Sequence, residues 1–167
     1  PHLRKPLMQQ GFTRKPRVLI VGAGAVGQTV GIRLADGGAV VTYLVKEKYK
    51  EKTQQGMVLH EITLGGGIRK YRTFVPEEVY GSPEETSGNL FDQVIICVSS
   101  PALRGDWLKR LAPFTGEVPI VSMTPGMQDR RYLESIFPPQ RVVTGMIGFI
   151  AYQCPLPGEE LFPPGVA

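Results

Sequence analysis

The stretch RVLIVGAGAVG, residues 17–27, decides the fold of this chain. Four aliphatic residues, 18–21, predict a buried strand, and the glycines after it have the spacing Gly22-x-Gly24-x-x-Gly27. A helical apolar pattern begins directly behind them. Strand, glycine spacing and helix in this order are typical of a dinucleotide-binding turn.

Each glycine of this turn has its own task in that interpretation. Gly22 permits the tight turn, Gly24 lets a pyrophosphate approach the backbone, and Gly27 lets the helix pack closely on the strand. The unpaired N–H groups and the positive dipole end of the helix would then face the phosphates. We therefore take Gly22, Gly24, Ala25, Val26 and Gly27 as cofactor-binding candidates. The alternative is a glycine-rich turn with a structural role alone.

The rest of the chain alternates between strand and helix patterns. We expect strands at 18–21, 40–45, 91–98, 118–123 and 141–151, and helices at 25–35, 101–111 and 128–136. Residues 57–62 and 69–75 predict a hairpin around the glycines 65–67, the mixed-charge run 46–52 predicts a short helix, and 76–90 reads as a loop. This alternation predicts an α/β fold, a Rossmann-type doubly wound and mostly parallel sheet with helices on both faces.

Three segments divide the chain. Residues 1–16 carry basic residues and prolines without an apolar period, which predicts a flexible basic leader. Residues 17–153 form the dinucleotide-binding domain. Residues 154–167 are rich in proline and glycine, and we expect them to form an exit segment toward a helical C-terminal domain that this chain lacks.

Composition excludes several classes of function. With 167 residues and 42% hydrophobic residues the chain can bury the core of one domain, and its net charge of +4 comes largely from the N-terminal segment. No nucleic-acid module, signal peptide or membrane-spanning run accompanies that charge. The two cysteines, Cys97 and Cys154, make neither a disulfide framework nor a metal site with His2 or His60. We expect a cytoplasmic protein without a metal, a nucleic-acid partner or a membrane partner.

Ligands of open parallel sheets bind beyond the carboxyl ends of the strands. That rule selects four segments: residues 22–27, Lys46 with its neighbours, residues 98–101 and residues 123–127. On the ribose and nicotinamide side it selects Val98, Ser99, Ser100, Pro101, Thr124 and Pro125. Ser99 and Ser100 have an alternative role as caps of the following helix.

The end of the second strand indicates which dinucleotide binds. An NAD-specific fold usually places Asp or Glu there to accept hydrogen bonds from the ribose hydroxyls, whereas this strand ends at Lys46. A cation at that position favours the additional phosphate of NADP(H). Two readings remain beside this one: Glu47 partly restores the acceptor, or Lys46 is a solvated surface charge.

The chain also resembles the N-terminal domain of the ketopantoate reductase family, the NADPH-dependent 2-dehydropantoate 2-reductases. The resemblance covers residues 17–158 and lies in five segments, VLIVGAGAVG at 18–27, VTYLVK at 41–46, FDQVIICV at 91–98, SMTPGM at 122–127 and FPPQRVVTG at 137–145. It implies reduction of a 2-oxo acid to a 2-hydroxy acid. It also implies a basic residue at Lys46 that faces the NADP phosphate.

Two positions depart from the family pattern. Ser99 stands where the family usually has a lysine near the cofactor, and Pro125 stands where it has an asparagine. Proline offers neither a side-chain donor nor a backbone N–H. The family's main catalytic lysine lies in a helical C-terminal domain, and nothing in this chain resembles that domain.

These departures leave other functions open. One is a non-catalytic dinucleotide-binding module or regulatory sensor, and another is an enzyme for a different 2-oxo or 2-hydroxy acid. His60 lies on a strand away from the expected cleft, which favours a surface or hydrogen-bonded histidine over a proton donor. A homodimer is a further expectation that the resemblance does not settle.

Overall fold

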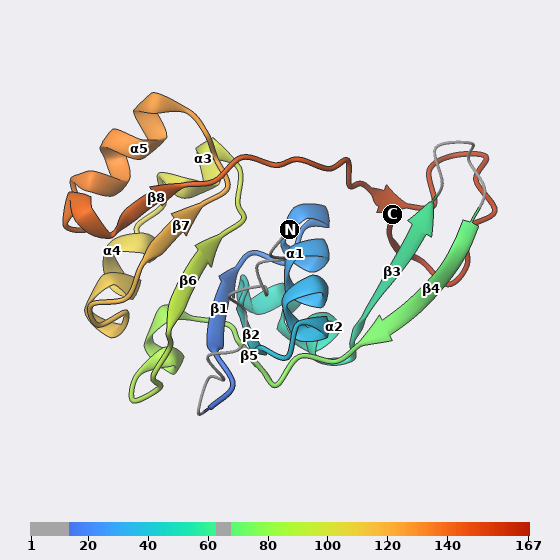
Figure 1. Ribbon diagram of the computed structural model, residues 1–167, viewed down its shortest axis with the longest axis horizontal. Helices are drawn as coiled ribbons and strands as arrows, with labels where there is room; N and C mark the ends of the chain where they lie inside the picture. Colours follow the sequence, from blue (N-terminus) through green and yellow to red (C-terminus); the bar gives the residue numbers. More distant parts are fainter. Residues whose placement is uncertain (1–13, 63–67) are drawn as a thin grey trace, which may run out of the picture.

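A six-stranded parallel sheet forms the centre of the computed structural model, which describes residues 14–62 and 68–167 (Figure 1). Its strands are β1 (Arg17–Val21), β2 (Val40–Leu44), β5 (Glu78–Tyr80), β6 (Gln93–Ile96), β7 (Ile120–Ser122) and β8 (Val142–Thr144). They lie in the order β5-β2-β1-β6-β7-β8, and every adjacent pair is parallel. The predicted α/β fold with a parallel sheet is confirmed.

Both faces of this sheet are covered by other elements, and alternate residues of each strand point to opposite faces. On one face, Val18 and Ile20 of β1 share a core with Ile32 of helix α1 (Ala25–Asp36). On the other face, Leu19 and Val21 pack in a core with residues of three further helices. These helices are α3 (Ser100–Leu103), α4 (Trp107–Leu111) and α5 (Met127–Glu134).

A second sheet covers the outer side of α1. It contains β3 (Met57–Ile62), β4 (Ile68–Phe74), β9 (Gln153–Cys154) and β10 (Gly165–Val166), in the order β4-β3-β10-β9. The antiparallel pairing of β3 with β4 confirms the expected hairpin, whose glycines 65–67 lie outside the described residues. Leu59 and Val166 of this sheet join the core of Ile32, so α1 lies between two sheets.

Several elements differ from the sequence expectation. The expected loop 76–90 contains β5, the edge strand of the central sheet, and a 3₁₀ turn, η2 (Pro83–Thr86). The expected helix 101–111 is interrupted between α3 and α4, where Gly105 lies against the ring of Trp107. The mixed-charge run forms the 3₁₀ turn η1 (Glu47–Tyr49) followed by α2 (Lys50–Gln54), as expected for a short helix.

The expected last strand, 141–151, is also shorter than predicted. Two further 3₁₀ turns, η3 (Ala112–Phe114) and η4 (Pro139–Arg141), precede β7 and β8. After β8 the chain leaves the sheet at Gly145 and crosses the upper part of the molecule toward the second sheet, where β9 lies (Figure 1). Residues 146–150 of this crossing are exposed.

Residues 1–13 of the expected leader lie outside the described residues, and the described residues that follow them contact the domain. Arg14 donates hydrogen bonds to the carboxylate of Asp92, and the carbonyl of Pro16 accepts one from Val40 at 2.8 Å. Residues 154–167 return to the second sheet through β10, which pairs in parallel with β3. That this segment leads toward another domain stays a prediction. Within the described ranges, no helix has the length and apolar character that a membrane span requires.

Ion pairs hold the η2 turn at the rim of the molecule. Glu84 accepts two hydrogen bonds of 2.6 Å from Arg110 of α4, and Glu85 accepts one of 2.6 Å from Lys50 of α2. The hydrogen bonds from Arg110 are the main reason why the pKa of Glu84 falls from 4.5 to about 2. A carboxylate with a lowered pKa in the folded state stabilises the fold only above its unfolded pKa.

We expect the ion pair of Glu84 to be lost as the pH falls from about 4.5 to about 2. The wild type should then melt at a slightly higher temperature than Glu84→Gln at pH 6, and this difference should shrink at pH 2, where about half of Glu84 is protonated in the folded state. Calorimetric melting curves measure this difference. Glu117→Gln is the control, because Glu117 is exposed and has no ion pair among the described residues. A Glu84→Gln difference that is as large at pH 2 as at pH 6 would contradict the assignment.

Candidate nucleotide-binding site

The turn between β1 and α1 requires glycine at its first position. Gly22 has a φ of +96°, which L side chains rarely adopt. A Cβ atom there would lie 2.8 Å from the carbonyl oxygen of Cys97, the residue that follows β6. The amide of Gly22 also donates to the carbonyl of Leu44 at 2.9 Å. The turn is thus held between the ends of β2 and β6.

The other two glycines meet opposite surroundings. A Cβ atom on Gly27 would lie only 2.0 Å from the carbonyl oxygen of Gly22, so α1 packs on the turn as closely as a backbone allows. A Cβ atom on Gly24 would meet no atom within 4 Å. Open space at Gly24 and close packing at Gly27 are the separate properties that the sequence pattern predicts.

The first turn of α1 is available to an anion. Gly24 occupies the cap position, no side chain caps the helix, and the first turn contains no acidic residue. The first intrahelical bond of the cap runs from the amide of Gln28 to the carbonyl of Gly24, at 2.9 Å. The earlier N–H groups have no partner within the helix, and together with the helix dipole they attract negative charge.

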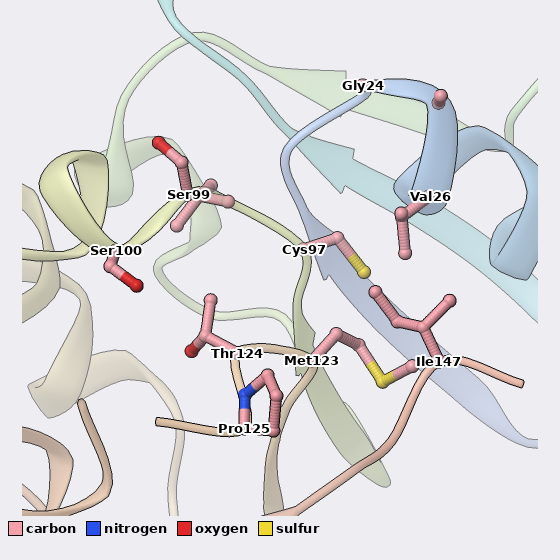
Figure 2. Close-up of a pocket in the computed structure, with 11 residues that line it drawn as sticks. Gly24, Val26, Cys97, Ser99, Ser100, Met123, Thr124, Pro125 and Ile147 are labelled. Atoms are coloured by element: carbon pink, nitrogen blue, oxygen red, sulfur yellow. The ribbon is translucent and has the colours of Figure 1, made fainter. Parts of the chain in front are cut away.

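Two cavities meet at Gly24. The smaller, of about 380 Å³, lies between the start of α1 and the segments that follow β6 and β7 (Figure 2). The larger, of about 1170 Å³, extends along the ends of β1 and β2 toward α2, α4 and the second sheet. Gly24, Cys97, Val98 and Ser99 line both cavities.

The predicted candidates lie on these cavities, with one exception. The smaller cavity is lined by Gly24, Ala25, Val26, Val98, Ser99, Ser100, Thr124 and Pro125. The larger cavity is lined by Gly22, Gly24, Lys46, Val98, Ser99 and Pro101. Gly27 is buried beneath the turn and lines neither.

The smaller cavity has a polar end and an apolar end. Figure 2 shows the hydroxyl oxygens of Ser100 and Thr124 at one end and the side chains of Val26, Met123 and Ile147 at the other. None of the described residues that line it carries a charge. The thiol of Cys97 stays protonated at neutral pH, because burial raises its pKa to about 12.

Three residues of this cavity, Cys97, Met123 and Ile147, were not among the single residues named as candidates. Cys97 lies in the expected strand 91–98, Met123 begins the selected segment 123–127, and Ile147 lies in the expected strand 141–151. That strand ends early, at Thr144, so Ile147 lies on the crossing segment, where it reaches the cavity. Gly145 and Gly148 in the sequence are the signal for this early end.

The larger cavity carries the positive charge. Lys46, Lys52 and Arg110 line it, and only Arg110 has an ion-pair partner among the described residues, Glu84. The carboxylate of Glu47 lies over Gly81, where an added Cβ would clash with its oxygen. Glu47 and Gly81 both line the larger cavity, and Lys46 beside them is exposed.

The hydroxyl groups of Ser99 and Ser100 do not cap α3. Ser99 occupies the cap position through its backbone, without a side-chain hydrogen bond to the helix. Ser100 instead donates to Oδ2 of Asp129 on α5 at 2.5 Å, and Arg104 donates to Oδ1 at 2.7 Å. The alternative in which the side chains of Ser99 and Ser100 cap this helix is therefore wrong.

His60 lies away from both cavities, as expected. Its side chain is buried, with 3% exposed, and Nε2 lies 2.8 Å from the carbonyl oxygen of Pro163. Nδ1 has no hydrogen-bond partner among the described residues. His60 lines neither cavity, which agrees with the expectation of a hydrogen-bonded histidine rather than a proton donor.

Comparison with known proteins agrees with this geometry. The profile of the family described as ketopantoate reductase PanE/ApbA matches residues 18–157, which is most of the chain. The chain belongs to the ketopantoate reductase family. It is 33% identical over 122 residues to the uncharacterized oxidoreductase YkpB of Bacillus subtilis (strain 168), a match that covers 72% of this chain and 36% of that protein. The chain thus spans about a third of the length of this relative.

Solved structures show the same fold. The 2-dehydropantoate 2-reductase from Methylococcus capsulatus superposes with a TM-score of 0.63 at 24% identity, over 82% of this chain and 42% of that chain. Octopine dehydrogenase in complex with NADH and agmatine superposes with a TM-score of 0.68 at 18% identity, over 83% and 37%. At these identities the likeness establishes the Rossmann-type fold alone.

Substitution of the two glycines by alanine should separate binding from folding. Gly27→Ala should destabilise the protein by about 1–3 kcal/mol, because its Cβ overlaps the carbonyl of Gly22. Gly24→Ala should cost less than about 1 kcal/mol, because its Cβ meets open space and the position is a helix cap.

Urea unfolding measures the two stabilities, and calorimetry measures dinucleotide affinity. Gly24→Ala should remain folded and lose at least about tenfold in affinity, because the added methyl group stands where a pyrophosphate approaches. Unchanged affinity in Gly24→Ala would contradict the placement of the phosphates at this turn.

Proposed function

We propose that this chain binds NADP(H) as the dinucleotide-binding part of an oxidoreductase that reduces a 2-oxo acid, such as 2-dehydropantoate, to the 2-hydroxy acid. The main support is Gly24, the point where an open helix start and two cavities meet. A dinucleotide has a diphosphate with a nucleoside on each side, and this arrangement offers one place for each of the three parts.

The properties of the cavities suggest the orientation of the cofactor. We place the diphosphate on the first N–H groups of α1, within reach of the backbone at Gly24. The adenosine half belongs in the larger cavity, which contains Lys46 and Lys52. The nicotinamide half belongs in the smaller cavity, where Val26, Met123 and Ile147 offer an apolar wall.

The charge near the end of β2 supports NADP(H) over NAD(H). Lys46 and Lys52 line the larger cavity without an ion-pair partner among the described residues, so a phosphate on the adenosine ribose would gain two cations. Glu47 also lines this cavity, with its carboxylate beside Gly81, so the two lysines give the described lining of this end an excess of positive charge. Both observations favour a phosphorylated ribose.

We expect the wild type to bind NADPH more tightly than NADH. Lys46→Glu should weaken NADPH binding by at least about tenfold and leave NADH binding nearly unchanged, because charge-assisted hydrogen bonds contribute about 1.5–3 kcal/mol. Lys109→Glu is the matched control, because it makes the same charge change on an exposed residue outside both cavities. Calorimetric titration measures the affinities. Equal affinity of the wild type for the two cofactors would contradict the preference.

The bound nicotinamide would supply the hydride, and this chain would hold and orient it. Reduction of a carbonyl also needs a proton at the developing alkoxide, and a group with a suitable pKa must reach that oxygen. The smaller cavity offers hydroxyl groups and no charged side chain among its described residues. We propose that the proton donor belongs to a helical C-terminal part of the protein that follows residues 154–167.

The decisive experiment measures NADPH oxidation by the full-length protein with a panel of 2-oxo acids. We expect turnover with at least one of them, and loss of turnover in Gly24→Ala. Calorimetry with NADPH separates binding from catalysis. If folded wild-type protein bound no nicotinamide dinucleotide, the proposed function would be wrong.

Two further expectations remain proposals. Cys97 and Cys154 are free thiols, which supports a reducing, cytoplasmic setting. A homodimer stays a prediction.

A further inference from the structure

Thr124 offers a hydrogen-bond donor to the smaller cavity. Behind it lies Ser122 at the end of β7, with 1% of its surface exposed. The Ser122 hydroxyl accepts a hydrogen bond from the amide of Thr124 at 3.3 Å and lies 2.6 Å from Thr124 Oγ1. A serine hydroxyl has one proton, and here its nearest acceptor is Thr124 Oγ1, because the carbonyl of Thr124 lies at 3.5 Å. Either hydroxyl can donate in this contact. In the arrangement in which Ser122 donates to Thr124 Oγ1, the Thr124 proton is free to point into the cavity.

Ser100 offers the opposite polarity. Its proton is donated to Oδ2 of Asp129 at 2.5 Å, and a carboxylate can only accept. Asp129 has 4% of its surface exposed, and Arg104 pairs with its other oxygen at 2.7 Å. The charge of Asp129 is therefore compensated in place, and Ser100 Oγ keeps only its lone pairs for the cavity.

A donor and an acceptor thus lie at the polar end of a cavity whose other end is apolar. A carboxamide on an aromatic ring has the complementary groups: a carbonyl that accepts, an amide NH₂ that donates, and a flat apolar ring. A carboxylate placed between these two hydroxyl groups would face the lone pairs of Ser100 and would find a donor only at Thr124. The hydrogen-bond polarity of this end thus favours a neutral amide over an anion.

Resting on the proposed function, we infer that Ser100 and Thr124 recognise the carboxamide of the nicotinamide. Ser100 accepts from its NH₂ group, and Thr124 donates to its carbonyl oxygen. Asp129 and Ser122 line neither cavity and act as positioning residues, because they fix the direction of each hydroxyl. The ring then extends toward Val26, Met123 and Ile147.

The test compares three oxidised cofactors by calorimetry. NADP⁺ carries the carboxamide, its 3-acetylpyridine analogue replaces NH₂ with a methyl group, and its thionicotinamide analogue replaces the carbonyl oxygen with sulfur. The wild type should bind each analogue roughly threefold to tenfold more weakly than NADP⁺, the value expected for one hydrogen bond.

The variants assign each contact. Ser100→Ala should bind NADP⁺ and the acetyl analogue equally, and should keep its preference over the thio analogue. Thr124→Val should bind NADP⁺ and the thio analogue equally, and should keep its preference over the acetyl analogue. Asp129→Asn can turn its amide NH₂ toward Ser100, which frees the serine proton and removes the preference over the acetyl analogue. Ser135→Ala, at the far end of α5, should keep both preferences.

The outcomes distinguish this inference from the proposed function. The probe 2′-phospho-ADP-ribose lacks the nicotinamide, and its binding tests the phosphate and adenosine sites alone. Suppose that 2′-phospho-ADP-ribose binds, but that the wild type binds NADP⁺, the acetyl analogue and the thio analogue with the same affinity. The carboxamide assignment is then overturned, and the proposed function stands. An unchanged preference in folded Ser100→Ala also overturns the assignment, even if Asp129→Asn fails to fold.

Discussion

The close approach of helix α1 to the end of β1 is the constraint on which the site depends. At Gly27 the helix contacts the turn so tightly that a Cβ atom would lie 2.0 Å from the carbonyl of Gly22. One turn further, Gly31 leaves room for the phenol of Tyr43, which donates to the carbonyl of Gly27 at 3.0 Å. Burial raises the pKa of Tyr43, so the phenol stays a donor. The helix start is thereby fixed at the edge of the sheet where both cavities open.

The sequence predicts the parts of the fold that depend on local patterns. The strand, turn and helix of residues 17–36 and the hairpin of β3 and β4 carry their own periodicity and glycines. By contrast, β5 has three residues and β10 has two, and each is held by pairing with a distant strand. Such short segments have no period of their own, so only their partners specify them.

The site also contains residues that a local pattern predicts and residues that only distant contacts specify. The rule that ligands bind beyond the carboxyl ends of parallel strands selected residues on both cavities without any knowledge of side-chain contacts. Asp129 escaped this reasoning because an acidic residue in the first turn of a helix is normally a solvated one. Here Ser100 and Arg104, from the segment after another strand, bury it and compensate its charge.

The uncharged smaller cavity has a consequence for the substrate. A 2-oxo acid carries a carboxylate, and burial of a carboxylate without a cation or several donors is costly. The described residues of this cavity offer hydroxyl groups at Ser99, Ser100 and Thr124, and Pro125 adds no donor. A 2-oxo acid bound beside the nicotinamide would thus need its counterion from another part of the protein. Under the proposed function, this chain orients the cofactor, and the counterion of the acid comes from outside the described lining of the smaller cavity.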